Sequence, residues 1–283
     1  MINLGIGIPF RRMGGGAANT ARTQAFLTAT GITDQTIISA LNAMDTSLIS
    51  AGLLPAGTGA GKLKVVYVFV GGSATTHKYN FVNPLDTNAA NRIVFNGGFT
   101  HNSNGITPNG INAFCETFVS GANLTNNSTS WSFYSRTDLT NDTVDLGGAN
   151  GTGDGVYCFT KRTVGNGGFI SNLYQTATRL EVPSIAASTK LIGASRTNST
   201  THKAYRDGVQ IGTTQTASNS LDITTMTTEI VLCAYRASAG GSPILNSSRN
   251  LCFAHIGEGL SDAEFAALNS AVVDLQTTLG RAV

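Results

Sequence analysis

LCFAHIGEGLSDAEFAALNSAVVDLQTTLG, residues 251–280, is the stretch that decides the fold, because its pattern predicts a strand, a glycine turn and an amphipathic helix. Ser261 and Glu264 form a capping-box pattern, in which each side chain can bind the backbone amide of the other residue. Behind this cap, apolar residues recur at helical spacing: Phe265, Leu268, Val272, Leu275 and Leu279. Gly280 follows where a left-handed residue commonly ends a helix. We therefore predict a C-terminal helix that packs its apolar side on a chain otherwise rich in strands.

The composition of the chain favours strands and turns. Only 12% of the 283 residues are charged and 33 are glycine, a balance that favours β structure over helices. One large β-sandwich of this length is ordinary. The formal net charge is +2 and the Lys and Arg residues are scattered, so no nucleic-acid partner is predicted. No apolar run reaches the length that crosses a membrane, so we expect no membrane partner.

The chain contains four cysteines: Cys115, Cys158, Cys233 and Cys252. None is paired with another at the CxxC spacing of zinc ribbons or redox motifs. We predict that they are buried thiols. A disulfide between Cys233 and Cys252 is left open, because a sequence does not supply the Cα separation that a bridge requires.

Upstream of residues 251–280, short strand candidates recur between turn clusters. The clearest signal is Asp207-Gly208 between two alternating runs, because a tight hairpin turn needs positive φ at both central residues. The predicted strands are 65–70, 79–82, 92–95, 112–119, 130–136, 155–161, 168–173, 190–197, 202–206, 209–213, 229–235 and 250–256. Their spacing is typical of a sandwich.

The pattern of residues 1 to about 30 predicts an extended arm. Apolar side chains alternate strictly at its start and precede a hinge of three glycines, Gly14 to Gly16. The alternating residues are Ile2, Leu4, Ile6, Ile8 and Phe10. Because such a segment suits strand addition, we expect the arm to pack on another chain or to extend a neighbouring sheet.

A helix is predicted after the arm, capped by Thr33 or Asp34 and ending near Gly52. Its apolar residues alternate spacings of four and three: Ile37, Leu41, Met44 and Leu48. Two arrangements remain open, a short coiled coil between copies and a single helix packed on its own β domain, because so short a coiled coil is marginal. We assign the arm and helix residues to partner binding. The chain then divides into an attachment region, 1–62, which ends in a glycine-rich linker, and a β domain, 63–283.

Two motifs resemble the concanavalin A-like, laminin-G-like jelly rolls. Tyr205-Arg-Asp-Gly-Val-Gln-Ile-Gly212 is similar to a hairpin of that family, and residues 253–264 are similar to its closing strand and LSDAE helix. The resemblance covers roughly residues 63–283. It implies a mainly β fold, an antiparallel jelly-roll β-sandwich of the concanavalin A-like lectin/glucanase type, with an N-terminal arm and helix and a C-terminal helix.

A wider set of segments resembles tailed-phage virion proteins that carry this jelly roll. The segments are the 33–55 helix, 69–78, Asn83-Pro-Leu-Asp86, 92–97, 132–137 and 275–281. Because lectins, adhesion modules and glycanases share the fold, the fold alone does not choose a function. The resemblance implies a virion protein on the capsid or tail surface, bound to other virion proteins through the arm.

The candidate chemical sites are weak. Glycanases of this fold use two carboxylates from a strand that reads Glu-x-Asp-x-x-Glu, and nothing in this chain matches it. The acidic residues Asp138, Asp142 and Asp145 lie in a polar stretch that predicts an exposed loop. Two loops, 83–91 with Asp86 and 145–154, carry oxygens that calcium prefers, but both are also ordinary turn sequences. We therefore predict no catalytic residue, no cofactor and no metal site, with calcium as the exception left open.

The histidines and the single tryptophan have structural interpretations. His77, His101, His202 and His255 have no pairing in sequence, so the fold would have to assemble any metal site. His255 lies among apolar residues of the closing strand and is predicted to be a hydrogen-bonded structural histidine. Trp131 is expected in the core, with an exposed sugar-stacking position as the alternative.

These observations lead to two expectations of function. The first is a non-enzymatic bacteriophage virion protein for decoration or adhesion, in which the arm attaches to the particle and the jelly roll projects outward. Its partners would be other virion proteins, copies of itself in a homotrimer, and host-surface glycans. The alternative is a carbohydrate-binding or carbohydrate-cleaving protein of the lectin/glucanase type, in which a face of the jelly roll holds a sugar.

Overall fold

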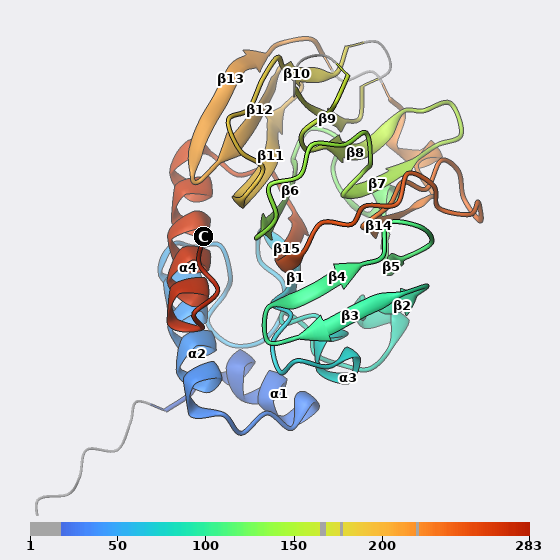
Figure 1. Cartoon of the computed structure of the whole chain (residues 1–283). Coiled ribbons are helices and arrows are strands. Elements are labelled where there is room, and N and C mark those ends of the chain that lie inside the picture. The colour runs from blue at the N-terminus through green and yellow to red at the C-terminus, as the bar shows by residue number, and fades with distance from the viewer. Residues whose placement is uncertain (1–17, 165–167, 176–177, 219–220) are drawn as a thin grey trace, which may run out of the picture.

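The protein is a β-sandwich with a layer of helices on one side (Figure 1). In this computed structural model, residues 18–164, 168–175, 178–218 and 221–283 are described. Two antiparallel sheets face each other, and helices from both ends of the chain cover the outer side of one of them. The predicted fold class is confirmed. No helix among these described residues is both long and apolar enough to span a membrane.

The eight-stranded sheet contains the closing strand of the chain. In spatial order its strands are β13 (Val209–Gln215), β12 (Thr201–Arg206), β11 (Lys190–Asn198), β6 (Thr129–Ser135), β15 (Leu251–Gly257), β4 (Gly105–Pro108) and β3 (Phe99–Asn102), with β1 (Leu63–Tyr67) also paired to β15. The seven-stranded sheet follows the order β10 (Leu180–Val182), β9 (Phe169–Leu173), β8 (Gly155–Phe159), β7 (Leu146–Ala149), β14 (Glu229–Leu232), β5 (Phe114–Ser120) and β2 (Val94–Asn96).

Two apolar layers hold this architecture together. One lies between the sheets and includes Trp131, which is fully buried and stacks on Phe133 and Phe169. The core position predicted for this tryptophan is therefore confirmed. The second layer lies between the eight-stranded sheet and the helices, and it contains Tyr205 stacked on Phe265 with ring centroids 4.1 Å apart.

The C-terminal helix, α4 (Asp262–Thr278), has the predicted cap and apolar side. The Glu264 amide donates to the Ser261 hydroxyl at 3.3 Å, and the Ser261 amide donates to the Glu264 carboxylate at 2.9 Å. Phe265, Leu268, Val272 and Leu275 are buried, and Leu279 is partly buried against the same layer. Gly280 has φ +65°, the left-handed conformation expected at the end of the helix.

The N-terminal helices pack on the same layer. Helix α2 (Gln35–Ser50) lies against α4 and buries Leu41, Met44 and Leu48, whereas Ile37 stays partly exposed. Of the two arrangements left open, the structure has the helix packed on its own β domain. In this conformation the three buried side chains are not available to a partner. Ile2, Leu4, Ile6, Ile8 and Phe10 lie outside the described residues, so their assignment to partner binding stays a prediction.

The extended arm does not continue to residue 30. Residues Ala21–Thr30 form helix α1, because Thr20 caps it and accepts a hydrogen bond from the Thr23 amide at 3.2 Å. Apolar alternation is confined to the start of the chain and does not reach this segment. A fully buried ion pair between Arg22 and Asp45 then joins α1 to α2.

Most predicted strands are present, and the Asp207-Gly208 turn is confirmed, with φ +54° and +77°. The strand predicted at 79–82 is wrong, because the Asn80 side chain binds the Val66 amide at 3.0 Å where a neighbouring strand would pair. Strands β3, β4, β7 and β10 were not predicted. The remaining short helices are α3 (Ala74–His77), η1 (Asn88–Ala90), η2 (Gly121–Asn123) and η3 (Ile223–Thr225).

Candidate functional site

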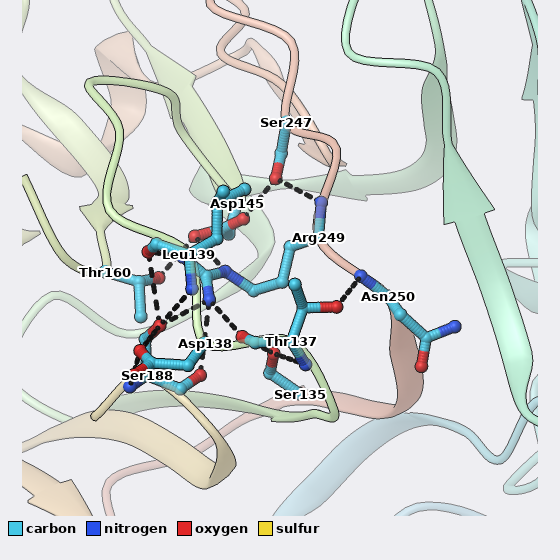
Figure 2. Close-up of polar contacts among 10 residues, drawn as sticks. All are labelled: Ser135, Thr137, Asp138, Leu139, Asp145, Thr160, Ser188, Ser247, Arg249 and Asn250. Carbon is cyan, nitrogen blue, oxygen red and sulfur yellow. Dashed lines mark hydrogen bonds and ion pairs between the residues drawn. The ribbon is translucent and has the colours of Figure 1, made fainter.

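The acidic stretch at residues 138–145 is partly buried and holds loops together. Asp145 is 1% exposed, so the prediction of an exposed loop is wrong at this residue. Its carboxylate accepts hydrogen bonds from the Ser247 hydroxyl at 2.5 Å, from Thr160 and from the Arg249 guanidinium at 3.2 Å (Figure 2). The cause is the buried Arg249 charge, which needs an anion beside it.

Arg249 joins its own segment to two others, residues 137–139 and Ser188. Its guanidinium donates to the Thr137 carbonyl at 2.8 Å, the Leu139 carbonyl at 2.9 Å and the Ser188 hydroxyl at 2.7 Å (Figure 2). Nearby Asp138 accepts the Ser188 amide at 2.9 Å, and this hydrogen bond lowers the pKa of Asp138. The groups that donate hydrogen bonds to these carboxylates come from the protein itself, so the stretch has a structural role.

The two loops considered for calcium do not gather a ligand set. Asp86 binds Lys78 at 2.5 Å and Arg92 at 2.9 Å, and Asp154 binds the Thr152 hydroxyl at 2.9 Å. In the parts of the chain that the structure describes, no group of three or more His, Cys, Asp or Glu side chains could hold a metal ion.

His255 has the structural role predicted for it. It is fully buried and hydrogen-bonds the hydroxyls of Ser130 at 3.0 Å and Ser132 at 2.6 Å, while burial lowers its pKa to about 3. His77 and His101, which have no pairing in sequence, are brought together by the fold with their Nδ1 atoms 3.0 Å apart. Burial, together with the neighbouring charge of His101, lowers the pKa of His77 to about 3.

A pocket of about 410 Å³ opens on the outer face of the seven-stranded sheet. Along β8, Val156 and Cys158 belong to the core between the sheets, so Tyr157 and Phe159 lie on the opposite face. These two aromatic residues and Tyr235, which follows β14, form the apolar side of the pocket. The polar side is contributed by Thr152, Gly153, Asp154, Asn172, Gln175 and Arg179.

The aromatic side of the pocket is a connected set of rings. Tyr157 and Tyr235 meet edge to face, with ring centroids 5.4 Å apart, and Tyr157 meets Phe159 in the same way at 6.2 Å. Gly147 makes this possible, because a Cβ there would lie 2.8 Å from the Tyr235 ring. Burial, with the neighbouring Tyr157, raises the pKa of Tyr235 to about 12, so its hydroxyl stays protonated and can donate a hydrogen bond.

The polar side presents both donors and acceptors. Arg179 is exposed, and its guanidinium lies 3.5 Å from the Tyr157 hydroxyl and 3.8 Å from Glu181. Asn172 is buried, and its side-chain amide bonds both the amide and the carbonyl of Gln175, at 2.9 and 3.0 Å. The floor of the pocket is therefore pre-organised, whereas Arg179 stays accessible.

Tyr235 is positioned through the next residue along the chain. The Arg236 backbone bonds Gly147 and Ala149 of β7, which places this segment on the face of the pocket. The Arg236 guanidinium binds both oxygens of Glu116 and also Glu229, at 3.0 Å. Burial, and a hydrogen bond that the protonated Glu229 donates to the Glu116 carboxylate, raise the pKa of Glu229. Two carboxylates from paired strands thus meet at the residue that follows Tyr235, although neither of them lines the pocket.

The sequence offered a faint signal for this site. Tyr157 and Phe159 alternate with core residues in a predicted strand, and that pattern indicates aromatic rings on a second face. Tyr235 ends a predicted strand, 229–235, with no role assigned to it, and Arg236 lies just beyond that strand. Arg179, Glu116 and Glu229 carried no signal, because their proximity depends on strand pairing between distant segments.

Neither known protein families nor curated protein sequences match the chain. Among solved structures it is similar to domain 4 of an extracellular GH43 arabinanase from Geobacillus stearothermophilus, in complex with arabinotriose, with 16% identity and a TM-score of 0.44 over 74% of this chain and 98% of that domain. It is also similar to a Trypanosoma rangeli sialidase mutant that displays trans-sialidase activity, with 14% identity and a TM-score of 0.49, over 87% of this chain and 39% of the sialidase.

A third similar structure is the CBM40 of the Ruminococcus gnavus IT-sialidase, with 16% identity and a TM-score of 0.36 over 50% of this chain and 82% of that domain. The chain thus spans well under half the length of the T. rangeli sialidase that it matches. At these identities and TM-scores the similarities concern the sandwich and carry no argument about ligand or activity.

Proposed function

We propose that the protein binds carbohydrate through the pocket on the outer face of its seven-stranded sheet. The observation that supports this most directly is the juxtaposition of Tyr157, Phe159 and Tyr235 with exposed Arg179. Sugars present C–H surfaces to aromatic rings and hydroxyls to fixed polar groups. A concave site with an apolar wall and a few placed donors and acceptors meets both requirements.

The composition of the pocket also fits this class of ligand better than an ion. The charged residues that line the pocket are Asp154 and Arg179, of opposite sign, so no strong field of one sign develops there. Neutral donors and acceptors, such as the Tyr235 hydroxyl, can hydrogen-bond the hydroxyl groups of a sugar. We expect modest affinity, because a pocket of about 410 Å³ encloses only a small part of an oligosaccharide.

A glycan array probed with the full chain tests the proposal. Tyr235→Ala should lower affinity for any bound glycan at least tenfold, since it removes one aromatic wall of the pocket. Tyr79→Ala is the matched control, because this partly exposed tyrosine packs against the layer between the eight-stranded sheet and the helices and does not line the pocket, so glycan binding should not change. Equal loss in both variants, or no glycan bound by the native chain, would contradict the proposal.

The cleaving alternative concerns the neighbouring pair Glu116 and Glu229. Carbohydrate cleavage generally uses two carboxylates with different protonation states, and these two share one guanidinium. A reducing-sugar assay on every glycan that the array identifies separates binding from cleavage. Product formed by the native chain but not by Glu229→Gln would replace the binding proposal by an enzymatic one.

The virion function remains a second proposal. It rests on the sequence resemblance and on the arm at Ile2 to Phe10, which lies outside the described residues. A decoration protein that binds host glycans would combine both proposals. Mass spectrometry of purified particles tests the virion assignment, and failure to find the chain there would end it. The homotrimer is tested by the mass of the full-length protein in solution.

A further inference from the structure

Three of the four cysteines lie on or beside the seven-stranded sheet, and strand register fixes their spacing. Cys158 pairs with Leu146 across β8 and β7, Leu146 pairs with Leu232 across β7 and β14, and Leu232 pairs with Cys115 across β14 and β5. Neighbouring strands lie about 4.8 Å apart. Cys158 is therefore about 14 Å from Cys115, too far for a bridge.

Cys233 is placed differently, because it directly follows Leu232 and so lies one residue from the position opposite Cys115. Regular alternation would put Leu232 and Cys233 on opposite faces of the sheet. Instead, Cys233 has φ +65°, and both residues belong to the apolar core between the sheets. The left-handed backbone thus turns the Cys233 thiol to the side on which Cys115 lies.

The backbone spacing of Cys115 and Cys233 suits a disulfide. A cross-strand pair separates Cα atoms by about 5 Å, and one residue along the strand adds about 3.3 Å at a right angle. The resulting separation is about 6 Å, inside the range of roughly 4.4 to 6.8 Å found in disulfides. Both side chains are fully buried, and their thiols interact directly.

The bridge left open in the sequence, Cys233 to Cys252, does not have this arrangement. Cys252 belongs to the second apolar layer, between the eight-stranded sheet and the helices, and its thiol donates to the Tyr134 carbonyl at 3.7 Å. Cys233 lies in the first layer, between the two sheets. The eight-stranded sheet therefore separates the two sulfur atoms.

We propose that Cys115 and Cys233 are a disulfide-forming pair, reduced in the present structure and bridged when the chain folds in the presence of a small-molecule disulfide. The two thiols lose two protons and two electrons and form one S–S bond. The small-molecule disulfide, oxidised glutathione, accepts two electrons and two protons and becomes two thiols. The bridge joins β5 to the end of β14, next to the segment that carries Tyr235 and Arg236.

Refolding is the condition under which this exchange should occur. Both sulfur atoms are inaccessible in the folded chain, and burial, with the neighbouring Cys233 thiol, raises the pKa of Cys115, so little reactive thiolate forms there. Oxidant added to folded protein should react slowly, whereas oxidised glutathione present during folding reaches both thiols before the sheets close.

The experiment refolds the full chain with a mixture of reduced and oxidised glutathione, alkylates it in denaturant and maps the peptides by mass spectrometry. We expect a peptide that joins Cys115 to Cys233 and alkyl groups on Cys158 and Cys252. Four alkylated cysteines, or any other pairing, would overturn the proposal. The double variant Cys158→Ser/Cys252→Ser should still form the bridge.

Thermal melting supplies the second readout. The bridged form should melt roughly 5 to 15 °C above the same protein after reduction, because the bridge closes a loop of more than one hundred residues. In Cys233→Ser, treatment with reductant should leave the melting temperature unchanged. A bridged form that melts no higher than the reduced protein would show that the bond does not fit the native spacing, against the proposal.

Discussion

A single substitution in the buried ion pair of Arg249 and Asp145 should lower the stability of the protein strongly. Arg249→Met keeps a long apolar side chain but removes the guanidinium that binds Asp145, Thr137, Leu139 and Ser188 (Figure 2). Asp145 is 1% exposed and would be left as a buried carboxylate without its cation. Breaking such a pair from one side costs about 3 to 5 kcal/mol.

For a domain of this size, 1 kcal/mol corresponds to a shift of about 2 to 4 °C in melting temperature. Arg249→Met should therefore melt roughly 6 to 20 °C lower than the native chain. The double variant Arg249→Met/Asp145→Leu should lose less stability than the two single variants added together, because it removes the unpaired charge. The free energy of unfolding is measured in urea by the fluorescence of Trp131, the single buried tryptophan.

The matched control is Arg92→Met, which breaks the partly exposed ion pair with Asp86. That loss should stay within about 1 kcal/mol, since surface pairs contribute little. The reasoning fails if Arg249→Met costs no more than Arg92→Met, or if the losses in the Arg249 and Asp145 single variants simply add in the double variant. Either result would mean that water reaches the pair and replaces the missing guanidinium.

Three further substitutions test the layer under α4, the close contact at Gly193 and the protonation of His255. Leu268→Asp should abolish cooperative thermal unfolding, because it places a charge in the layer under α4, whereas exposed Ala266→Asp should change stability by about 0.5 kcal/mol or less. Gly193→Ala should cost about 1 to 3 kcal/mol in urea unfolding, because its Cβ would lie 2.4 Å from the Trp131 carbonyl oxygen and 2.7 Å from the Phe265 ring. Burial lowers the pKa of His255 from 6.5 to about 3, so the residue takes up a proton on unfolding at pH 5, and stability should fall by about 2 kcal/mol from pH 7 to pH 5 because of it. His255→Gln should reduce the total fall by about that amount, while His77, whose pKa is also lowered to about 3, keeps its own contribution.

Local patterns were sufficient to predict the helix ends and the hairpin. These features are the capping box at Ser261 and Glu264 and the turn at Asp207-Gly208. Each involves residues no more than three positions apart, so the local sequence determines its geometry. Strands β3 and β10 escaped prediction for the converse reason. They are only four and three residues long, and their pairing partners stabilise them more than their own composition does.

The helix at residues 35–50 shows why a sequence pattern alone does not predict partner binding. Its apolar stripe predicted burial but did not identify the surface that buries it, since a coiled coil and a β domain require the same spacing. Contact with α4, more than two hundred residues away in sequence, decides the question for Leu41, Met44 and Leu48.

The sequence by itself determined the fold class, the cap and apolar side of α4, and the burial of Trp131 and His255. The cap and apolar side of α4 follow from short-range periodicity, and the burial of Trp131 follows from the cost of exposing an apolar side chain. The position of His255 follows from its apolar neighbours, and the sandwich from composition, strand spacing and the resemblance to jelly rolls. Only the tertiary structure decided that Asp145 is buried, that Tyr157 and Tyr235 share a pocket, and that Cys115 faces Cys233. The physical reason is that these contacts join residues about eighty to one hundred and twenty positions apart, through strand register that no local pattern records.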